Sequence, residues 1–187
     1  MELDHAIGFS GQVDKSVYLH PNSREYIMIA GCSIVTGDLN DPHNQHFLTA
    51  HDDLISCIAV SNQGHLLASG KFINSTFLFN IFWTNLGQKG DNSDVVIWDY
   101  NAKKAIYRLS EHDHAVSHLA FSHDDKLLIS VGSQLDGKMF IWNTDNGYIV
   151  SSLQVTPTIF ADGVSSIQWG GFIKDIKLRN TSNYQFA

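Results

Sequence analysis

The chain has 187 residues, 43% of them apolar, which is enough to bury one sizeable core. Its formal net charge is -7 and its 12 lysine and arginine residues are scattered, which argues against nucleic acid as a main partner, because phosphate contacts need clustered cations. The N-terminus shows neither a basic region nor a long apolar stretch, so the sequence predicts no secretory signal, no membrane partner and a reducing intracellular compartment.

The first part of the chain predicts one irregular four-stranded unit. A short strand, Ile7–Phe9, precedes it. Turn residues then separate four apolar segments, which we expect to be strands, at Val17–His20, Glu25–Ile29, Cys32–Val35 and Gln45–Leu48. Cys32 and Cys57 both lie in apolar strand patterns and are too few for a disulfide framework, so we expect two buried, reduced thiols.

Two clearer units follow, each with four predicted strands and turn residues between them. The strands of the first are expected at Ile55–Val60, Leu66–Ser69, Val95–Asp99 and Ala105–Leu109, and those of the second at Val116–Phe121, Leu127–Val131, Lys138–Asn143 and Tyr148–Leu153. A last unit opens with Val164–Trp169 as its first strand and Tyr184–Ala187 as its second.

The two clear units are copies of each other. In each, a histidine (His51 or His112) is followed by a strand, by a second strand with a serine and a glycine, and by a third strand that ends in Trp98-Asp99 or Trp142-Asn143. This order resembles the WD repeat of β-propellers, and self-similarity at this period is stronger support than any single residue. The sequence therefore predicts an all-β WD-repeat β-propeller.

The predicted blades are 7–48, 51–109, 112–153 and 164–187, about three and a half blades of one incomplete propeller over residues 1–187. A closed propeller has about four to eight complete blades. We therefore expect a fragment, an incomplete gene product, or a protein whose missing blades come from another chain.

One segment interrupts the repeat. Trp142 follows Gly132 by ten residues, whereas Trp98 follows Gly70 by twenty-eight. The excess is an insertion at approximately 72–88, and Phe72–Trp83 within it is rich in aromatic residues and asparagine. Three interpretations stay open: a loop that docks into a partner, a loop folded onto its own blade, and the translation of a retained intron.

Repeated polar residues predict a buried structural network in each clear blade: His51, Ser69 and Trp98, then His112, Ser130, Asp136 and Trp142. A histidine held by an aspartate, with serine as relay and the tryptophan N–H as terminal donor, would satisfy every polar group. A Ser-His-Asp catalytic triad is the alternative, but a nucleophile occurs once whereas this set recurs. The first copy should be weaker, because Asn92 stands where Asp136 does.

No catalytic, cofactor-binding or metal-binding residues are predicted. The pairs His43 with His46 and His112 with His114 have plausible spacing for ligands, but no Cys-x-x-Cys or His-Glu-x-x-His motif accompanies them. We therefore expect a protein that is not an enzyme and holds no cofactor.

Further stretches add a likeness beyond the generic repeat: Leu3–Gly11 with Ile7-Gly8-Phe9, His20-Pro21, Gly31-Cys32, Phe47-Leu48, Ala50-His51 and Asp94–Tyr100. Together these resemble the cilia- and flagella-associated WD-repeat proteins that lie inside doublet microtubules. The resemblance implies the first blades of a two-propeller chain and a structural scaffold in the axoneme of a cilium or flagellum. It also implies tubulin and neighbouring inner proteins as partners.

Candidate contact residues are the turn residues Asn40, Asp41, Asn101 and Lys103, which we expect to be exposed, together with the aromatic residues of the insertion. The alternative function is a soluble WD-repeat adaptor, for example in a ubiquitin ligase.

Overall fold

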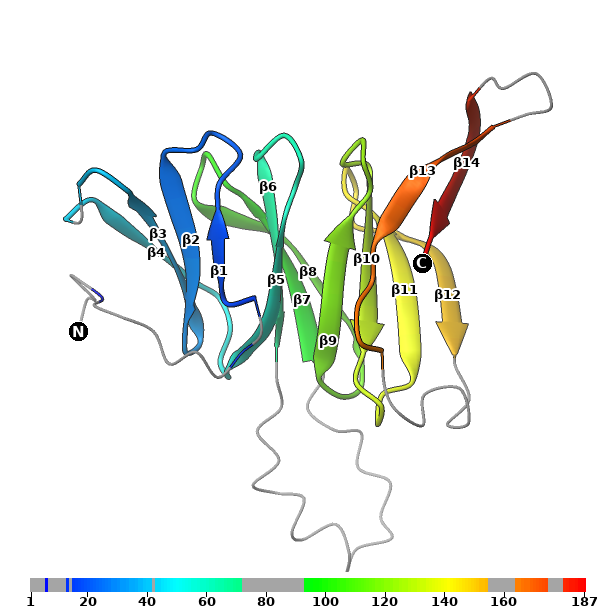
Figure 1. The fold of residues 1–187 in the computed structure, drawn as a ribbon. Coiled ribbons are helices and arrows are strands. Elements are labelled where there is room, and N and C mark those ends of the chain that lie inside the picture. Colours follow the sequence, from blue (N-terminus) through cyan, green and yellow to red (C-terminus); the bar gives the residue numbers. More distant parts are fainter. Residues whose placement is uncertain are drawn as a thin grey trace, which may run out of the picture.

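The fold was analysed in a computed structural model, which describes residues 6, 13, 15–41, 43–71, 93–154, 164–174 and 180–187. Within these residues all regular elements are strands, which form three four-stranded sheets and one two-stranded hairpin (Figure 1). The same residues contain no helix that is long and apolar enough to span a membrane. The predicted all-β fold built from four-stranded blades is confirmed.

Each four-stranded sheet is an antiparallel meander in which strands pair in chain order. The first blade contains β1 (Val17–Leu19), β2 (Glu25–Ala30), β3 (Ser33–Asp38) and β4 (Gln45–Thr49). The second contains β5 (Ile55–Val60), β6 (Leu66–Lys71), β7 (Ser93–Asp99) and β8 (Lys104–His112). The third contains β9 (Val116–Phe121), β10 (Leu127–Gly132), β11 (Lys138–Asn143) and β12 (Ile149–Gln154).

The two tryptophans of the repeat occupy equivalent third strands. Trp98 lies on β7 opposite Leu67, and Trp142 lies on β11 opposite Leu128. Each tryptophan is only 2% exposed. The copies in the sequence are therefore copies in space.

The core lies between neighbouring blades, because each central strand is covered on both faces. Along β7, Val95 and Ile97 belong to the apolar cluster shared with the third blade, whereas Val96 and Trp98 belong to the cluster shared with the first. Successive side chains of a strand point to opposite faces, so a strand between two blades needs apolar residues at every position. This requirement explains why the Val95–Trp98 run is continuous rather than alternating.

The last unit departs from the prediction. The expected first strand, Val164–Trp169, is instead β13 (Trp169–Lys174), which pairs antiparallel with β14 (Asn180–Phe186). Residues 164–168 lie beside β9, where the His118 ring bonds the Ser165 carbonyl and the Trp169 indole N–H donates to the Ala120 carbonyl. These side-chain bonds replace a strand ladder there, and the backbone bonds to Ala187 begin only at Gln168.

The predicted burial of both cysteines is half wrong. Cys57 on β5 is half-buried, and burial raises the pKa of its thiol to about 12. Cys32 is exposed, because Gly31 and Cys32 form the tight turn between β2 and β3 instead of the start of a strand. Gly31 has a φ of 65°, a value that glycine adopts without strain.

Two predicted features lie outside the described residues: the short strand Ile7–Phe9 and the insertion at 72–88. The strands on either side of that insertion are well defined. β6 ends at Lys71, β7 begins at Ser93, and the two pair in continuous register from Leu66 opposite Asp99 to Gly70 opposite Val95.

Candidate functional site

The four predicted polar residues of the third blade form one chain of hydrogen bonds. The Trp142 indole N–H donates to Ser130 Oγ at 2.8 Å, and Ser130 Oγ lies 2.8 Å from His112 Nε2. His112 Nδ1 lies 2.7 Å from Asp136 Oδ2. The carboxylate can only accept, so Nδ1 carries a proton, and in the neutral ring Nε2 then accepts from the serine hydroxyl.

Asp136 also fixes the loop that enters β9. Its Oδ1 accepts from the backbone N–H groups of Asp113 and His114, at 2.7 and 2.9 Å. Burial alone would raise the pKa of Asp136, but the hydrogen bonds to His112 and to these two N–H groups lower it below its ordinary value. The charged carboxylate thus links the end of β8 to the start of the third blade.

The second blade carries a shorter version of this network. The Trp98 indole N–H donates to Ser69 Oγ at 2.8 Å, and Ser69 Oγ lies 2.7 Å from His51 Nε2. Within the described residues, His51 Nδ1 has no hydrogen-bond partner; Asn92, at the position of Asp136, lies outside them. Burial, helped by the nearby Arg108, lowers the pKa of His51 to about 4.

Neither network is arranged for nucleophilic catalysis. Ser130, His112 and Ser69 are all 0% exposed, so no substrate can reach the serine hydroxyls. Each serine oxygen accepts the N–H of a buried tryptophan. The geometry ties neighbouring strands of a blade together and, through His112, joins the end of β8 to the third blade, and that is the structural role that we propose for it.

A second kind of contact, which sequence reasoning missed, joins the blades at one rim. The Asp125 carboxylate accepts from the backbone and side-chain N–H groups of Asn62 and from the backbone N–H of Gln63, at 2.7 to 2.9 Å. On the other side, His20 Nε2 lies 2.8 Å from the Gly64 carbonyl, and its ring stacks on Tyr100 at 4.2 Å. We call these contacts between the β1–β2, β5–β6 and β9–β10 turns the rim clasp.

The rim clasp has a signal in the sequence, although a faint one. Ser23, Gly64 and Asp125 hold the same position in the three turns, and all three have a left-handed backbone with φ of 57°, 77° and 59°. Aspartate tolerates this conformation better than most side chains. The adjacent Asp124-Asp125 pair predicts a turn. It does not predict that Asp125 contacts the β5–β6 turn of the neighbouring blade, because tertiary packing brings the two turns together.

The first strands of the blades, β1, β5 and β9, are called the inner strands here. They show a third repeated contact, in which a side chain of one blade donates a hydrogen bond to a backbone carbonyl of the next unit. The Tyr18 hydroxyl donates to the Ile58 carbonyl at 3.1 Å, and the Ser56 hydroxyl donates to the Val116 carbonyl at 2.5 Å. The His118 ring continues the series at the Ser165 carbonyl, 3.2 Å away. Edge strands with free carbonyls invite pairing with other chains, and these donors reduce that risk.

Of the four turn residues expected to be exposed, three are. Asn40, Asp41 and Asn101 face solvent. The predicted exposure of Lys103 is wrong. Its side chain is only 23% exposed, because the ammonium group lies 3.5 Å from the centre of the Tyr100 ring and 4.0 Å from Glu25. Burial lowers the pKa of Lys103, partly offset by the Glu25 charge.

One of the four histidines that could suggest a metal, His112, has other partners. His112 is held by Asp136 and Ser130. Among the residues that the structure describes, no three histidine, cysteine or acidic side chains gather as a metal site would need.

Comparison with known proteins identifies the repeat. The WD40 family, described as WD domain, G-beta repeat, matches residues 43–77 and 103–143. Cilia- and flagella-associated protein 52 of Chlamydomonas reinhardtii is 35% identical over 145 residues, which are 78% of this chain and 21% of that protein. The human protein of the same name is 34% identical over 143 residues, 76% of this chain and 21% of its own length.

Among solved structures, the crystal structure of the RRP9 WD40 repeats has a TM-score of 0.61 at 22% identity and covers 81% of this chain and 40% of that one. At this identity the likeness concerns the fold alone. The chain spans about a fifth of the length of the curated relatives that it matches.

Proposed function

This chain is a WD-repeat β-propeller protein similar to cilia- and flagella-associated protein 52, and from this premise we propose that it is a structural scaffold inside ciliary or flagellar doublet microtubules. In this role it binds tubulin and neighbouring inner proteins and stabilises the axoneme. The observation that carries the proposal is the 35% identity to the Chlamydomonas protein over 78% of this chain.

The arrangement of polar groups supports a scaffold or adaptor more than an enzyme. The Ser-His-Asp set that could suggest chemistry is buried and repeated in part, and it links strands. The turns at the rims are available to partners, since Asn40, Asp41 and Asn101 are exposed. Several modest contacts of this kind on a repeating lattice add up through multivalency, as a scaffold on a microtubule wall requires.

Fractionation of a ciliated cell that expresses the tagged chain tests this proposal. We expect the protein to remain with axonemes after detergent extraction and a high-salt wash, because contacts on a lattice are released together or not at all. Recovery in the detergent-soluble cytosol, with none in salt-washed axonemes, would contradict the scaffold and favour a soluble WD-repeat adaptor. Capture of cullin-type partners from that cytosol would then support the adaptor in a ubiquitin ligase.

A further inference from the structure

The outer edge of the third blade is open along its length. β12 is the last strand of its sheet and lies on the outside of the blade in Figure 1. All six of its residues are exposed, and among the residues that the structure describes β11 is its one paired strand. The side of β12 that faces away from β11 therefore presents unpaired backbone N–H and C=O groups, which can bind a further strand.

The outer edges of the other two blades are protected. In the second blade, β8 carries Lys104, Arg108 and Glu111, and charged side chains on an edge discourage pairing with another chain. In the first blade, the side-chain amide of Gln45 on β4 exchanges two hydrogen bonds with the backbone of Ala6, at 2.9 and 3.1 Å. Ala6 thus lies against β4.

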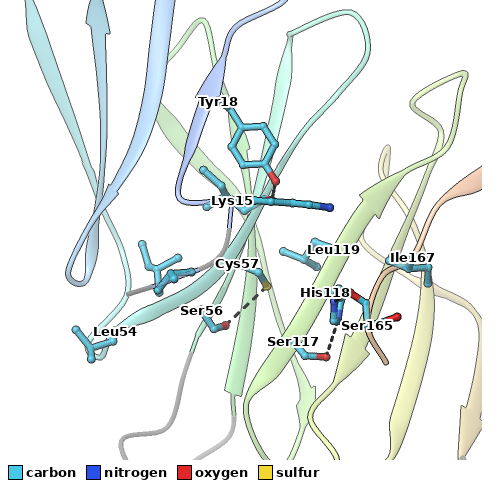
Figure 2. A pocket seen from close by; sticks show the side chains of 13 residues that line it. Lys15, Tyr18, Leu54, Ser56, Cys57, Ser117, His118, Leu119, Ser165 and Ile167 are labelled. Carbon is cyan, nitrogen blue, oxygen red and sulfur yellow. Dashed lines mark hydrogen bonds between the residues drawn. The ribbon is translucent and has the colours of Figure 1, made fainter. Parts of the chain in front are cut away.

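The inner edges of the blades have protection of another kind. Tyr18 on β1 and His118 on β9 each donate a hydrogen bond to a carbonyl of the next unit, and Figure 2 shows both side chains at this edge. These donors occupy carbonyls that an added strand would need for its ladder.

The sequence of β12 lacks protecting charges. No charged residue occurs from Gly147 to Ala161, a range that includes the whole strand. Counted from the tryptophans of the repeat, Ser152 occupies on β12 the position that Arg108 occupies on β8. The third blade therefore has a serine where the second blade has a charge at its edge, and uncharged strands of this kind pair readily with other strands.

A further blade would not cover this edge, because blades stack face to face. Leu109 on the face of β8 is 6% exposed beneath the third blade, whereas Ile106 of the same strand is 43% exposed. Leu153 holds on β12 the position of Leu109 and would be covered by such a blade. The backbone edge of β12 would remain open.

We propose that β12 pairs antiparallel with β12 of a second copy of this chain, with Ser151 and Ser152 at the two-fold axis. The two four-stranded sheets then form one continuous sheet. A second copy fits because two identical uncharged strands place no like charges opposite each other, although each chain carries a net charge of -7. A charged partner strand would find no opposite charge there.

The two serines favour pairing about this axis. Their small side chains let the two backbones approach, and their hydroxyl groups can hydrogen-bond across the axis. The edge is separate from the turns of the rims, so the dimer does not depend on the scaffold function.

Sedimentation velocity of the full chain from about 1 to 200 µM tests the proposal, since one pair of strands buries little surface and should give a weak dimer. We expect a monomer–dimer equilibrium. The double variant Ser151→Lys with Ser152→Lys should weaken the dimer by at least about tenfold, because like charges then face each other. The double variant Ser151→Glu with Ser152→Glu should do the same.

An equal mixture of the two double variants should dimerise at least as tightly as the unchanged chain, because opposite charges then face each other. This recovery would also show that both variants are folded. The matched control is Asn101→Lys with Ala102→Lys, which adds the same charge at exposed positions of the β7–β8 turn.

The control should change the dimerisation constant by no more than about twofold. Monomers alone at about 200 µM or oligomers larger than a dimer would overturn the proposal. Equal losses in the control and in the lysine variant at β12, or no recovery in the mixture, would overturn it as well.

Discussion

At the scale of single residues, Asp136 has more bonds to make than any other group of the networks. Its two oxygens accept from the His112 ring and from the backbone N–H groups of Asp113, His114 and Lys138. Asp136→Ala leaves these four buried or half-buried donors without an acceptor, so we expect the free energy of unfolding to fall by about 1–3 kcal/mol. Urea unfolding of the variant checks this value.

Asp145→Ala is the control for this variant, because Asp145 is exposed on the β11–β12 turn. Its stability should differ from that of the wild type by no more than about 0.5 kcal/mol. If Asp136→Ala unfolds at the same urea concentration as this control, the network has no structural role.

The histidine of the second blade makes stability depend on pH. The pKa of His51 is lowered from 6.5 to about 4, so between these values the unfolded chain binds a proton that the folded chain does not. The stability from His51 is therefore complete above pH 6.5 and is lost as the pH falls to about 4, by up to roughly 3 kcal/mol.

Urea unfolding across this pH range measures the slope. His51→Gln should flatten it, whereas His46→Gln, at an exposed position on β4, should leave it unchanged. The same slope in the wild type and in His51→Gln would show that another group is responsible.

At the scale of elements, the rim clasp predicts that blades are coupled through their turns. Asp125→Gly keeps a residue that adopts the left-handed backbone but removes the carboxylate that holds Asn62 and Gln63. We expect a loss of about 1–3 kcal/mol and faster hydrogen exchange at the amides of Asn62 and Gln63, in the neighbouring blade.

Ser23→Gly is a matched substitution, since Ser23 holds the equivalent turn position of the first blade and is exposed. It tests the backbone effect of glycine alone and should change stability by only a few tenths of a kcal/mol. Unchanged exchange at Asn62 and Gln63 in Asp125→Gly would mean that the turns of the two blades are not coupled.

The insertion is expected to be dispensable for its blade. β6 and β7 pair in register without interruption, so deletion of residues 72–83 should leave the flanking strands paired, because the closure entropy of a loop changes slowly with its length. Hydrogen exchange at Ala68 and Ile97, which face each other across these strands, measures the outcome. Loss of protection there would show that the deleted residues are part of the core.

At the scale of the whole molecule, the sequence predicts the blades well because each strand carries its own signal. The paired His-strand-Trp copies set the order of strands, and the continuous apolar run of β7 follows from its place between two blades. The predicted polar network residues are also close in space: strand pairing places Ser130 beside Trp142, and His112 reaches Ser130 from the end of β8.

Contacts between blades could not be predicted from the sequence. These contacts join residues 40 or more positions apart, which come together only when the blades pack. They are the hydrogen bonds from Tyr18 to Ile58 and from Ser56 to Val116, and the rim clasp. The predicted strand at Val164–Trp169 and the predicted exposure of Lys103 were wrong for the same reason, because contacts with a neighbouring strand and with the Tyr100 ring decide the outcome.

The central claim, a scaffold within doublet microtubules, is tested most directly by cryo-electron tomography. Doublets would be compared from ciliated cells that express the chain with and without a bulky globular fusion. We predict additional density inside the doublet lumen, in contact with the tubulin wall and repeated along the axis. Additional density confined to the outer surface, or no difference in doublets although the fusion is present in the cytosol, would contradict the account.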